Sequence, residues 1–193
     1  MSAPAPARLR AAAGAADEDA AAPAVADQEL GASLGVAIGG AQTAGGLRVE
    51  GHYLYQLSDV DWFDGRVAFT FGSGGAACFR DRADELVCDH GAADGFAGEL
   101  GGGVRRWLGG QQGFRPWAEA GAAVRMIRFG DDDLTGVALP LSLAGGVRAR
   151  AGDLIAIGGF AALEVGPAVF GGGLGASLQA GLVVGVTVDF AMP

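Results

Sequence analysis

The two histidines are the first candidates for chemistry, because an imidazole ring can take up or release a proton near neutral pH. His52 lies two positions after Glu50, on the same face of a predicted strand, so the two side chains could interact. No serine stands beside His52 on that strand, and no His-x-Ser pattern accompanies His90. Nucleophilic catalysis needs a base within hydrogen-bond reach of an activated hydroxyl group. We therefore predict that His52 is a structural residue, hydrogen-bonded to a neighbour, and that the protein is not an enzyme.

A glycine-rich run is the second candidate. Residues 171–176, Gly-Gly-Gly-Leu-Gly-Ala, match the loose G-x-G-x-x-A pattern of dinucleotide-binding proteins. That pattern needs a following helix within a βαβ unit, whereas the residues after Ala176 alternate between apolar and other types. We predict a turn followed by small inward-facing residues, with no cofactor and no metal site.

Composition excludes two classes of protein. All 13 basic residues are arginine, 22 residues are acidic, and the net charge is −9, whereas a nucleic-acid binder of this size is usually basic. Half of the chain is apolar and 18% is charged, which excludes intrinsic disorder for most of it. We expect one folded domain within these 193 residues, and no nucleic-acid partner.

Strict alternation of side-chain types predicts the elements that position the charged residues. From Glu29 to Phe190, eight segments place apolar residues on one face and glycine, small or charged residues on the other. An even number of long antiparallel strands is typical of a closed barrel. The sequence therefore predicts an all-β fold, an eight-stranded antiparallel up-and-down transmembrane β-barrel. Pro140 lies inside the sixth segment, where it removes a ladder hydrogen bond, so we expect a bulge there or a position close to the outer rim.

The polar face carries positive and negative charges in nearly equal number. Buried ions must be paired, because an isolated ion in a low-dielectric interior costs several kcal/mol. A balanced set of charges on a face of mostly small residues suits a narrow, packed lumen. We predict an interior polar network of Arg48, Glu50, His52, Arg66, Glu99, Arg105, Glu119, Arg125, Arg148, Arg150, Glu164, Gln179 and Asp189.

The apolar face is continuous over strands long enough to cross a bilayer at a tilt. Residues 165–188 carry no charge, but their glycines and Pro167 disfavour a helix, and the alternation from Leu174 to Phe190 indicates a strand. A soluble, lipocalin-like barrel with the apolar face inside is the alternative. Eight aromatic residues toward strand ends are expected to form interfacial girdles on the lipid face: Tyr53, Tyr55, Trp62, Phe63, Trp107, Trp117, Phe129 and Phe170.

Residues 29–190 resemble the small eight-stranded outer-membrane barrels of Gram-negative bacteria, of the outer-membrane protein A and X type. The run from Leu182 to Phe190 is similar to the terminal assembly signal of that family, although this chain continues for three more residues. The resemblance implies a bacterial outer membrane, contacts with its lipid and lipopolysaccharide, insertion by the barrel-assembly machinery, and a monomer. It also implies that both termini lie in the periplasm and that the connections at 41–45, 72–95, 130–136 and 166–173 are extracellular.

The longest of these connections, residues 72–95, holds both cysteines. Because an exported chain meets an oxidising compartment, we predict a disulfide bond between Cys78 and Cys88, with two unpaired thiols as the alternative. The acidic residues of this loop and of 131–133 are expected to be solvated, or else to attract divalent cations that bridge lipopolysaccharide.

The first residues differ from the rest. Residues 1–28 are rich in alanine, carry the acidic run at 17–19 and show no alternation, so we expect a disordered leader or tail before a barrel at 29–193. Residues 24–26, Ala-Val-Ala, resemble a cleavage site, but no apolar stretch of signal-peptide type precedes them. Either a signal lies upstream of this start, or the segment is a flexible mature terminus.

These observations favour a structural or surface-interaction barrel whose lumen is plugged by an arginine–carboxylate network. The first alternative is a narrow channel for water or small ions. The second is a lipid A-modifying enzyme, since some eight-stranded outer-membrane barrels are lipid A acyltransferases or deacylases. A soluble ligand-binding barrel is the third.

Overall fold

The computed structural model describes residues 27–40, 42–75, 77–80, 82–83, 86–109, 113–130, 133–171 and 175–192. Residues 1–26 of the predicted tail lie outside these ranges. Gln28, which we placed in the tail, is the first residue of strand β1 (Gln28–Ile38).

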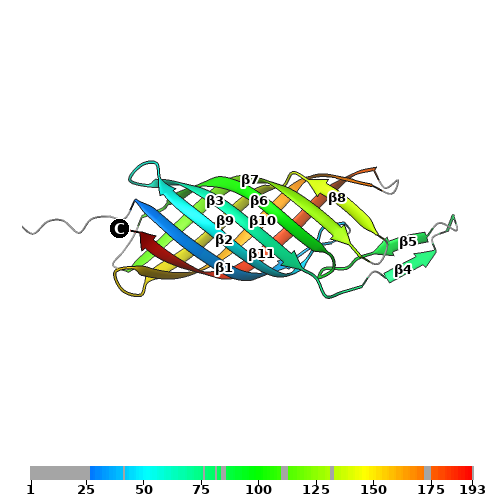
Figure 1. Ribbon diagram of the computed structural model, residues 1–193, viewed down its shortest axis with the longest axis horizontal. Helices are drawn as coiled ribbons and strands as arrows, with labels where there is room; N and C mark the ends of the chain where they lie inside the picture. Colours follow the sequence, from blue (N-terminus) through cyan, green and yellow to red (C-terminus); the bar gives the residue numbers. More distant parts are fainter. Residues whose placement is uncertain are drawn as a thin grey trace, which may run out of the picture.

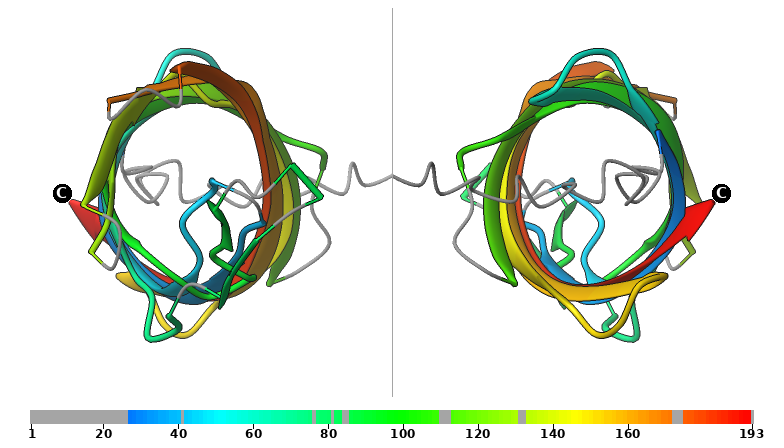
Figure 2. Two further views of the ribbon diagram at one scale, coloured as in Figure 1. Left: turned by 90° about the vertical axis from the view of Figure 1, so that its right-hand side faces the viewer. Right: turned by 90° about the vertical axis from the view of Figure 1, so that its left-hand side faces the viewer.

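Nine antiparallel strands form one sheet that closes into a ring (Figures 1 and 2). After β1, these are β2 (Gly46–Gln56), β3 (Asp61–Phe71), β6 (Phe96–Trp107), β7 (Phe114–Phe129), β8 (Leu134–Ala138), β9 (Leu141–Arg150), β10 (Ile155–Phe170) and β11 (Gly175–Met192). The ring closes because β11 pairs with β10 on one side and with β1 on the other. The predicted all-β barrel is confirmed. Its strand count differs by one because the chain here is divided into β8, which precedes the sixth predicted segment, and β9, which lies within it.

Pro140 causes that division. The amide of Ala123 donates to the carbonyl of Pro140 at 3.0 Å, and Pro140 has no N–H with which to return the bond. On either side of the break, β8 and β9 keep one register: Ala138 pairs with Arg125, and Leu141 pairs with Ala122. No residue is inserted between these described pairs, so the predicted bulge is wrong. Because β7 continues well past Ala123, the alternative of a position at the rim is wrong too.

The two ends of the ring differ. One end, here called the terminal end, holds the start of β1, the end of β11 and the connections β2–β3, β6–β7 and β9–β10. At the other end a hairpin of β4 (Ala77–Arg80) and β5 (Leu86–Asp89) projects beyond the ring, and we call this the hairpin end (Figure 1). Strands reach further toward the hairpin end than predicted, because β8 begins at Leu134 and β10 extends to Phe170.

The apolar face points outward. Leu34 on β1 and Val186 on β11 are more than half exposed, whereas Arg48 and Glu99 are buried inside the ring. This orientation suits a bilayer and contradicts the soluble alternative, which requires the apolar face inside. The uncharged stretch at 165–188 forms parts of β10 and β11 where it is described, as the alternation predicted. Among the described residues, no helix is long and apolar enough to cross a membrane.

The predicted aromatic girdles are wrong for five of the eight residues. Tyr53, Tyr55 and Phe63 point outward, while the five others are buried inside the ring: Trp62, Trp107, Trp117, Phe129 and Phe170. Proximity to a strand end suggested an interfacial position, but the alternation of side chains along each strand assigns these five to the inner face.

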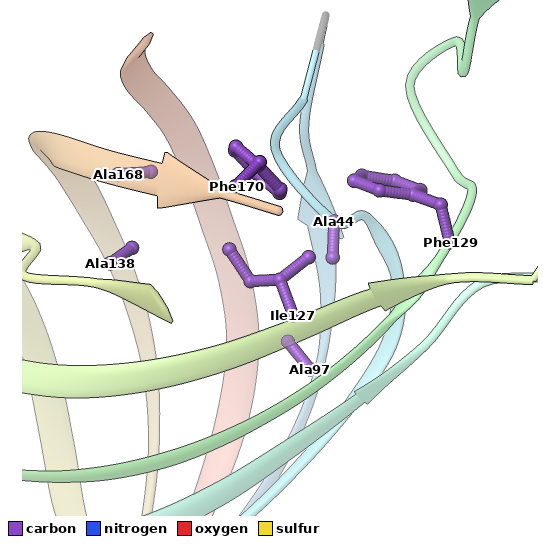
Figure 3. Packing of buried hydrophobic residues seen from close by; sticks show 7 residues of the cluster. All are labelled: Ala44, Ala97, Ile127, Phe129, Ala138, Ala168 and Phe170. Carbon is purple, nitrogen blue, oxygen red and sulfur yellow. The ribbon is translucent and has the colours of Figure 1, made fainter. Parts of the chain in front are cut away.

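The buried apolar residues form two layers inside the ring. The hairpin layer consists of Ala44, Ala97, Ile127, Phe129, Ala138, Ala168 and Phe170 (Figure 3). The terminal layer consists of Leu54, Trp62, Trp107 and Trp117. Strand β6 passes both: Ala97 lies near its start in the hairpin layer, and Trp107 ends it in the terminal layer.

Candidate functional site in the barrel interior

The charged side chains of the inner face form one group, which we call the ion cluster. Its members come from eight strands and are Arg48, Arg66, Arg105, Arg125 and Arg148 with Glu29, Glu50, Asp64, Glu99, Glu119, Glu164 and Asp189. Each member lies on the inner face of its strand because alternate residues of a strand share a face. On β6, for example, Ala97, Glu99, Arg105 and Trp107 all face inward, so this strand carries its charged residues between its contributions to the two apolar layers.

Glu99 is the centre of the cluster's hairpin side. Its Oε1 accepts a hydrogen bond from Arg48 Nη2 at 3.0 Å, and its Oε2 accepts one from Arg125 Nε at 2.7 Å. Arg125 also binds Glu164, whose other oxygen lies 3.6 Å from Arg48 Nη1. Two guanidinium groups thus share two carboxylates. Glu50 lies at the edge of this group and is 3.0 Å from Arg48 Nη2.

Arg66 and Arg105 connect this group to the middle of the barrel. Arg66 donates to Glu119 at 2.6 Å and to the hydroxyl oxygen of Ser142 at 2.7 Å, and its Nε lies 3.7 Å from Glu99. Arg105 donates from Nε to Glu119 at 3.0 Å and from Nη2 to Asp64. Adjacent nitrogens of one guanidinium therefore hold two different carboxylates side by side.

The terminal side of the cluster contains the histidine. His52 Nε2 lies 2.7 Å from Asp189 Oδ1, which also accepts a hydrogen bond from the Thr187 hydroxyl at 3.1 Å. Arg148 donates to Glu29 at 3.0 Å and lies 3.4 Å from Asp189 Oδ2. The neighbour of His52 is therefore Asp189, which is 137 residues distant in sequence, and not Glu50 as the spacing suggested.

The terminal layer packs its indole rings against two arginines of the cluster and against Arg115, which lies outside it. The guanidinium carbons of Arg148 and Arg115 lie 4.0 Å and 4.7 Å from the ring centroid of Trp107, and that of Arg105 lies 4.2 Å from Trp117. Such contacts attract a cation to the electron-rich ring face. The tryptophans therefore cover the terminal side of the cluster and interact with its charges as well.

The hairpin layer is completed by chain segments from outside the sheet. The described residues of the connection at 39–45 fold inside the outline of the ring, where they are drawn in blue (Figure 2). The amide of Gly39 donates to Ala92 and that of Gly45 to Asp94, both at 3.0 Å, which joins this connection to the segment at 90–95. The His90 ring stacks on Phe129 with centroids 3.8 Å apart, and its Nδ1 lies 2.9 Å from Asp94.

Most of the predicted network belongs to the cluster or, like His52, contacts it, but two predicted residues do neither. Arg150 is exposed at the last position of β9. Gln179 is buried near the hairpin end, where its Nε2 donates to the carbonyl of Gln42 at 2.6 Å. Its role is to hold the connection at 39–45 rather than to contact the ions.

Sequence reasoning missed two members, Glu29 and Asp64. Both lie on the inner face next to the residues that we assigned to faces: Glu29 precedes the outward Leu30, and Asp64 precedes Arg66 by two positions. Extending each pattern by one step toward the terminal end would have found them. With these two acids added and the exposed Arg150 removed, the six arginines and five acids of the prediction become five arginines and seven acids among the described residues.

Two other predictions concern groups that the structure describes only in part. The register of β4 and β5 places Cys78 opposite Cys88, but both side chains lie outside the described residues, so their disulfide bond stays a prediction. The glycine run at 171–176 leads into strand β11 and not into a helix, which excludes the dinucleotide motif. In the described part of the chain, no three histidine, cysteine or acidic residues are grouped so as to hold a metal ion.

Comparisons with known proteins bear on the fold. No protein-family model matches the sequence, and no curated protein matches it. Among solved structures, neisserial surface protein A aligns with a TM-score of 0.65 at 10% identity, covering 86% of this chain and 97% of that one. The N-terminal barrel of Pseudomonas aeruginosa OprF aligns with a TM-score of 0.46 at 16% identity, covering 84% and 97%. Ail, the attachment invasion locus protein of Yersinia pestis, gives 0.42 at 13% identity, covering 85% and 99%.

Only the first of these alignments has a TM-score above 0.5, and it covers almost the whole of the related barrel. The closed antiparallel ring, the apolar outer face and this likeness agree with one another. The chain therefore has the fold of the small eight-stranded outer-membrane β-barrels.

Proposed function

We propose that this protein is a structural outer-membrane barrel with a closed interior, which presents the loops of its hairpin end at the cell surface. The observation that carries the proposal is the ion cluster placed between two apolar layers. On this proposal the barrel is a monomer that contacts lipid and lipopolysaccharide, and the barrel-assembly machinery inserts it.

Energetics support a closed interior. An eight-stranded barrel has an interior just wide enough for side chains. A solute ion would have to pass the hairpin layer, separate the paired groups around Glu99, and then pass the tryptophans of the terminal layer. Removing one partner of a buried ion pair costs about 3–5 kcal/mol, and the transit would disturb several such pairs. We propose no enzymatic activity, because no hydroxyl or thiol group among the described residues hydrogen-bonds to His52: its Nε2 pairs with Asp189, and its Nδ1 has no partner in the described part of the chain.

Conductance in planar lipid bilayers tests the closed interior. The refolded protein is expected to give no current steps, and regular steps from the wild-type chain would favour the narrow channel instead. A variant that should be easier for ions to cross replaces Trp62, Trp107 and Trp117 by alanine, which removes most of the terminal layer. Its matched control replaces the outward residues Phe69, Phe71 and Phe96 by alanine, which changes the lipid face and leaves the interior intact.

Epitope tags test the location and the orientation. A tag placed in the β7–β8 connection at the hairpin end is expected to bind antibody on intact cells. The same tag in the β9–β10 connection at the terminal end is expected to bind only after the outer membrane is permeabilised. Binding at the terminal end alone on intact cells would reverse the proposed orientation, and no binding at either end until the inner membrane is opened would contradict the outer-membrane location.

A further inference from the structure

Three arginines lie close together at the terminal end, on the inner face of β7 and β9. Arg115 on β7 is directly opposite Arg148 on β9. Arg150 follows Arg148 by two positions, so it is the diagonal neighbour of Arg115 on the same face. The amide of Arg150 donates to the carbonyl of Gly113 at 3.3 Å, which continues the β7–β9 ladder to this point. We call these three residues the arginine group.

Among the described residues, only one member of the arginine group is neutralised by an acid. Arg148 pairs with Glu29, whereas Arg115 and Arg150 form no ion pair with any residue that the structure describes. Arg115 is half-buried and lies over the ring of Trp107, which Arg148 also contacts. Because like charges directly opposite each other on neighbouring strands repel, an anion beside Arg115 and Arg150 would stabilise this end of the barrel.

The described acids near the arginine group do not supply that anion. Asp153 lies in the β9–β10 connection and lines a small pocket together with Arg150, but the two form no ion pair. Glu29 lines the same pocket, and Arg148 already occupies both oxygens of its carboxylate. Asp189, the third acid of the pocket, is buried in the ion cluster. An anion for the two other arginines therefore has to come from outside the described residues.

The chain before Asp27 brings acids to this end of the barrel. Asp27 extends the β1–β2 ladder by one hydrogen bond at the terminal end, and Glu29, two residues later, contacts Arg148. The acidic run at 17–19, Asp-Glu-Asp, contains the only acids that precede Asp27. Eight residue steps separate its last member from Asp27, which allows a reach of up to about 29 Å. The run is therefore tethered within reach of the arginine group.

We propose that the acidic run at 17–19 docks on the arginine group, where its carboxylates pair with Arg115 and Arg150 and hold the segment across the terminal end. Charge complementarity and the place where the described chain begins support this occupant. A free anion such as phosphate carries the same kind of charge, but the tethered run has a high effective concentration beside the group. The inference does not depend on a closed interior or on the membrane in which the barrel lies.

Paramagnetic relaxation, measured by NMR on the full-length protein refolded in micelles, tests the docking. A nitroxide label is attached at Ala20→Cys, next to the run, in a chain that also carries Cys78→Ser and Cys88→Ser. Strands β7 and β9 lie on the far side of the ring from β1, so a label on an undocked segment should broaden the β2–β3 connection most. We expect the reverse, with the strongest broadening at the amides of Arg115 and Arg150.

Matched variants show whether charge holds the segment. Replacing the three acids at 17–19 by their amides should remove the excess broadening on β7 and β9, and so should Arg115→Gln combined with Arg150→Gln. The control replaces the three aspartates at 131–133 by asparagine, which makes the same change of charge at the hairpin end and should leave the broadening in place. Salt at about 1 M, where charges are screened beyond about 3 Å, should act like the variant at 17–19.

Four outcomes would overturn the proposal. Broadening in the unsubstituted run that is no stronger at β7 and β9 than at the β2–β3 connection would mean that the run does not dock. Broadening that survives the amide substitutions at 17–19 would mean that charge does not hold the segment. If inorganic phosphate shifts the Arg115 and Arg150 signals with equal affinity with and without those substitutions, the group takes external anions and the run does not occupy it. A protein recovered from cell envelopes whose intact mass lacks residues 1–26 would have no run to dock. The variant at 17–19 remains decisive if the arginine variant fails to fold, because the run precedes the first strand.

Discussion

The two apolar layers close the same barrel by different means. The terminal layer is built wholly from strand residues, three of them tryptophans, and its rings lie against arginines of the ion cluster. The hairpin layer combines small strand residues such as Ala97 with Ala44, which a connection brings inside the ring. Closure at the terminal end is therefore part of the sheet, whereas closure at the hairpin end depends on segments that fold onto it.

This contrast has a consequence for stability. Residues that belong to the sheet share in its cooperative unfolding, while connections often open locally at lower free energy. We expect substitutions in the ion cluster and the terminal layer to affect the whole barrel. Substitutions at the hairpin end should first affect the segments at 39–45 and 90–95.

The largest effect is expected for Glu99→Ala. This change leaves Arg48 and Arg125 without their common partner, and removal of one member of a buried ion pair costs about 3–5 kcal/mol. The free energy of unfolding, measured by urea titration in micelles, should fall by that amount. Glu50→Ala is the control, because Glu50 lies at the cluster's edge beside a single arginine and should cost less. Equal losses for the two variants would show that Glu99 is not the centre of the cluster.

Trp107→Ala should lower the free energy of unfolding by nearly as much as Glu99→Ala. Replacing a buried tryptophan by alanine typically costs about 3–5 kcal/mol, and this ring also contacts Arg115 and Arg148. The loss should appear as a single transition by tryptophan fluorescence and by circular dichroism, because the residue belongs to the sheet. Separate transitions by the two methods would indicate that the terminal layer opens independently of the ring.

A smaller and more local effect is expected for His90→Ala. The variant loses the stacking on Phe129 and the contact with Asp94, each of which is worth about 0.5–1.5 kcal/mol. Amide hydrogen exchange should accelerate at Gly39 and Gly45, whose bonds join the two inward segments. Exchange in the β1–β11 ladder should not change. Faster exchange throughout the ring would contradict the local closure of the hairpin end.

Pro140→Ala should have a small effect. The new N–H can donate to Ala123, which gains about 0.5–1.5 kcal/mol, but the unfolded chain regains about 0.4–1 kcal/mol of conformational freedom. The two terms nearly cancel, so the urea midpoint should barely move. A clear loss of stability would mean that the interruption between β8 and β9 is needed for the curvature of the ring.

The smallest effect on the barrel is expected from reduction of the predicted Cys78–Cys88 disulfide bond. Neither thiol should react with a labelling reagent before reduction, and both should react afterwards. The unfolding of the ring should not change, since β4 and β5 form a sheet of their own. Labelling of both cysteines in the unreduced protein would contradict the disulfide bond.

Much of the interior could be predicted because a strand alternates its faces residue by residue. That rule placed Arg48, Arg66, Glu99 and Arg125 inside without knowledge of any partner. The predictions for Trp107 and Phe129 were wrong because they relied on position along the strand instead of on the alternation. It also failed at strand ends, where Glu29 and Asp64 extend the pattern by one step.

The sequence by itself determined which face of each strand meets lipid, because a period of two leaves only two arrangements and only one of them suits a bilayer. Tertiary structure alone decided which charged side chains pair with one another. The pairs of Arg48 with Glu99 and of His52 with Asp189 join strands distant along the chain. Their distances depend on the stagger of neighbouring strands, which is a property of the closed ring as a whole. The inward folding of residues 39–45 was likewise decided there, since its contacts with 90–95 and Gln179 exist only once the ring has closed.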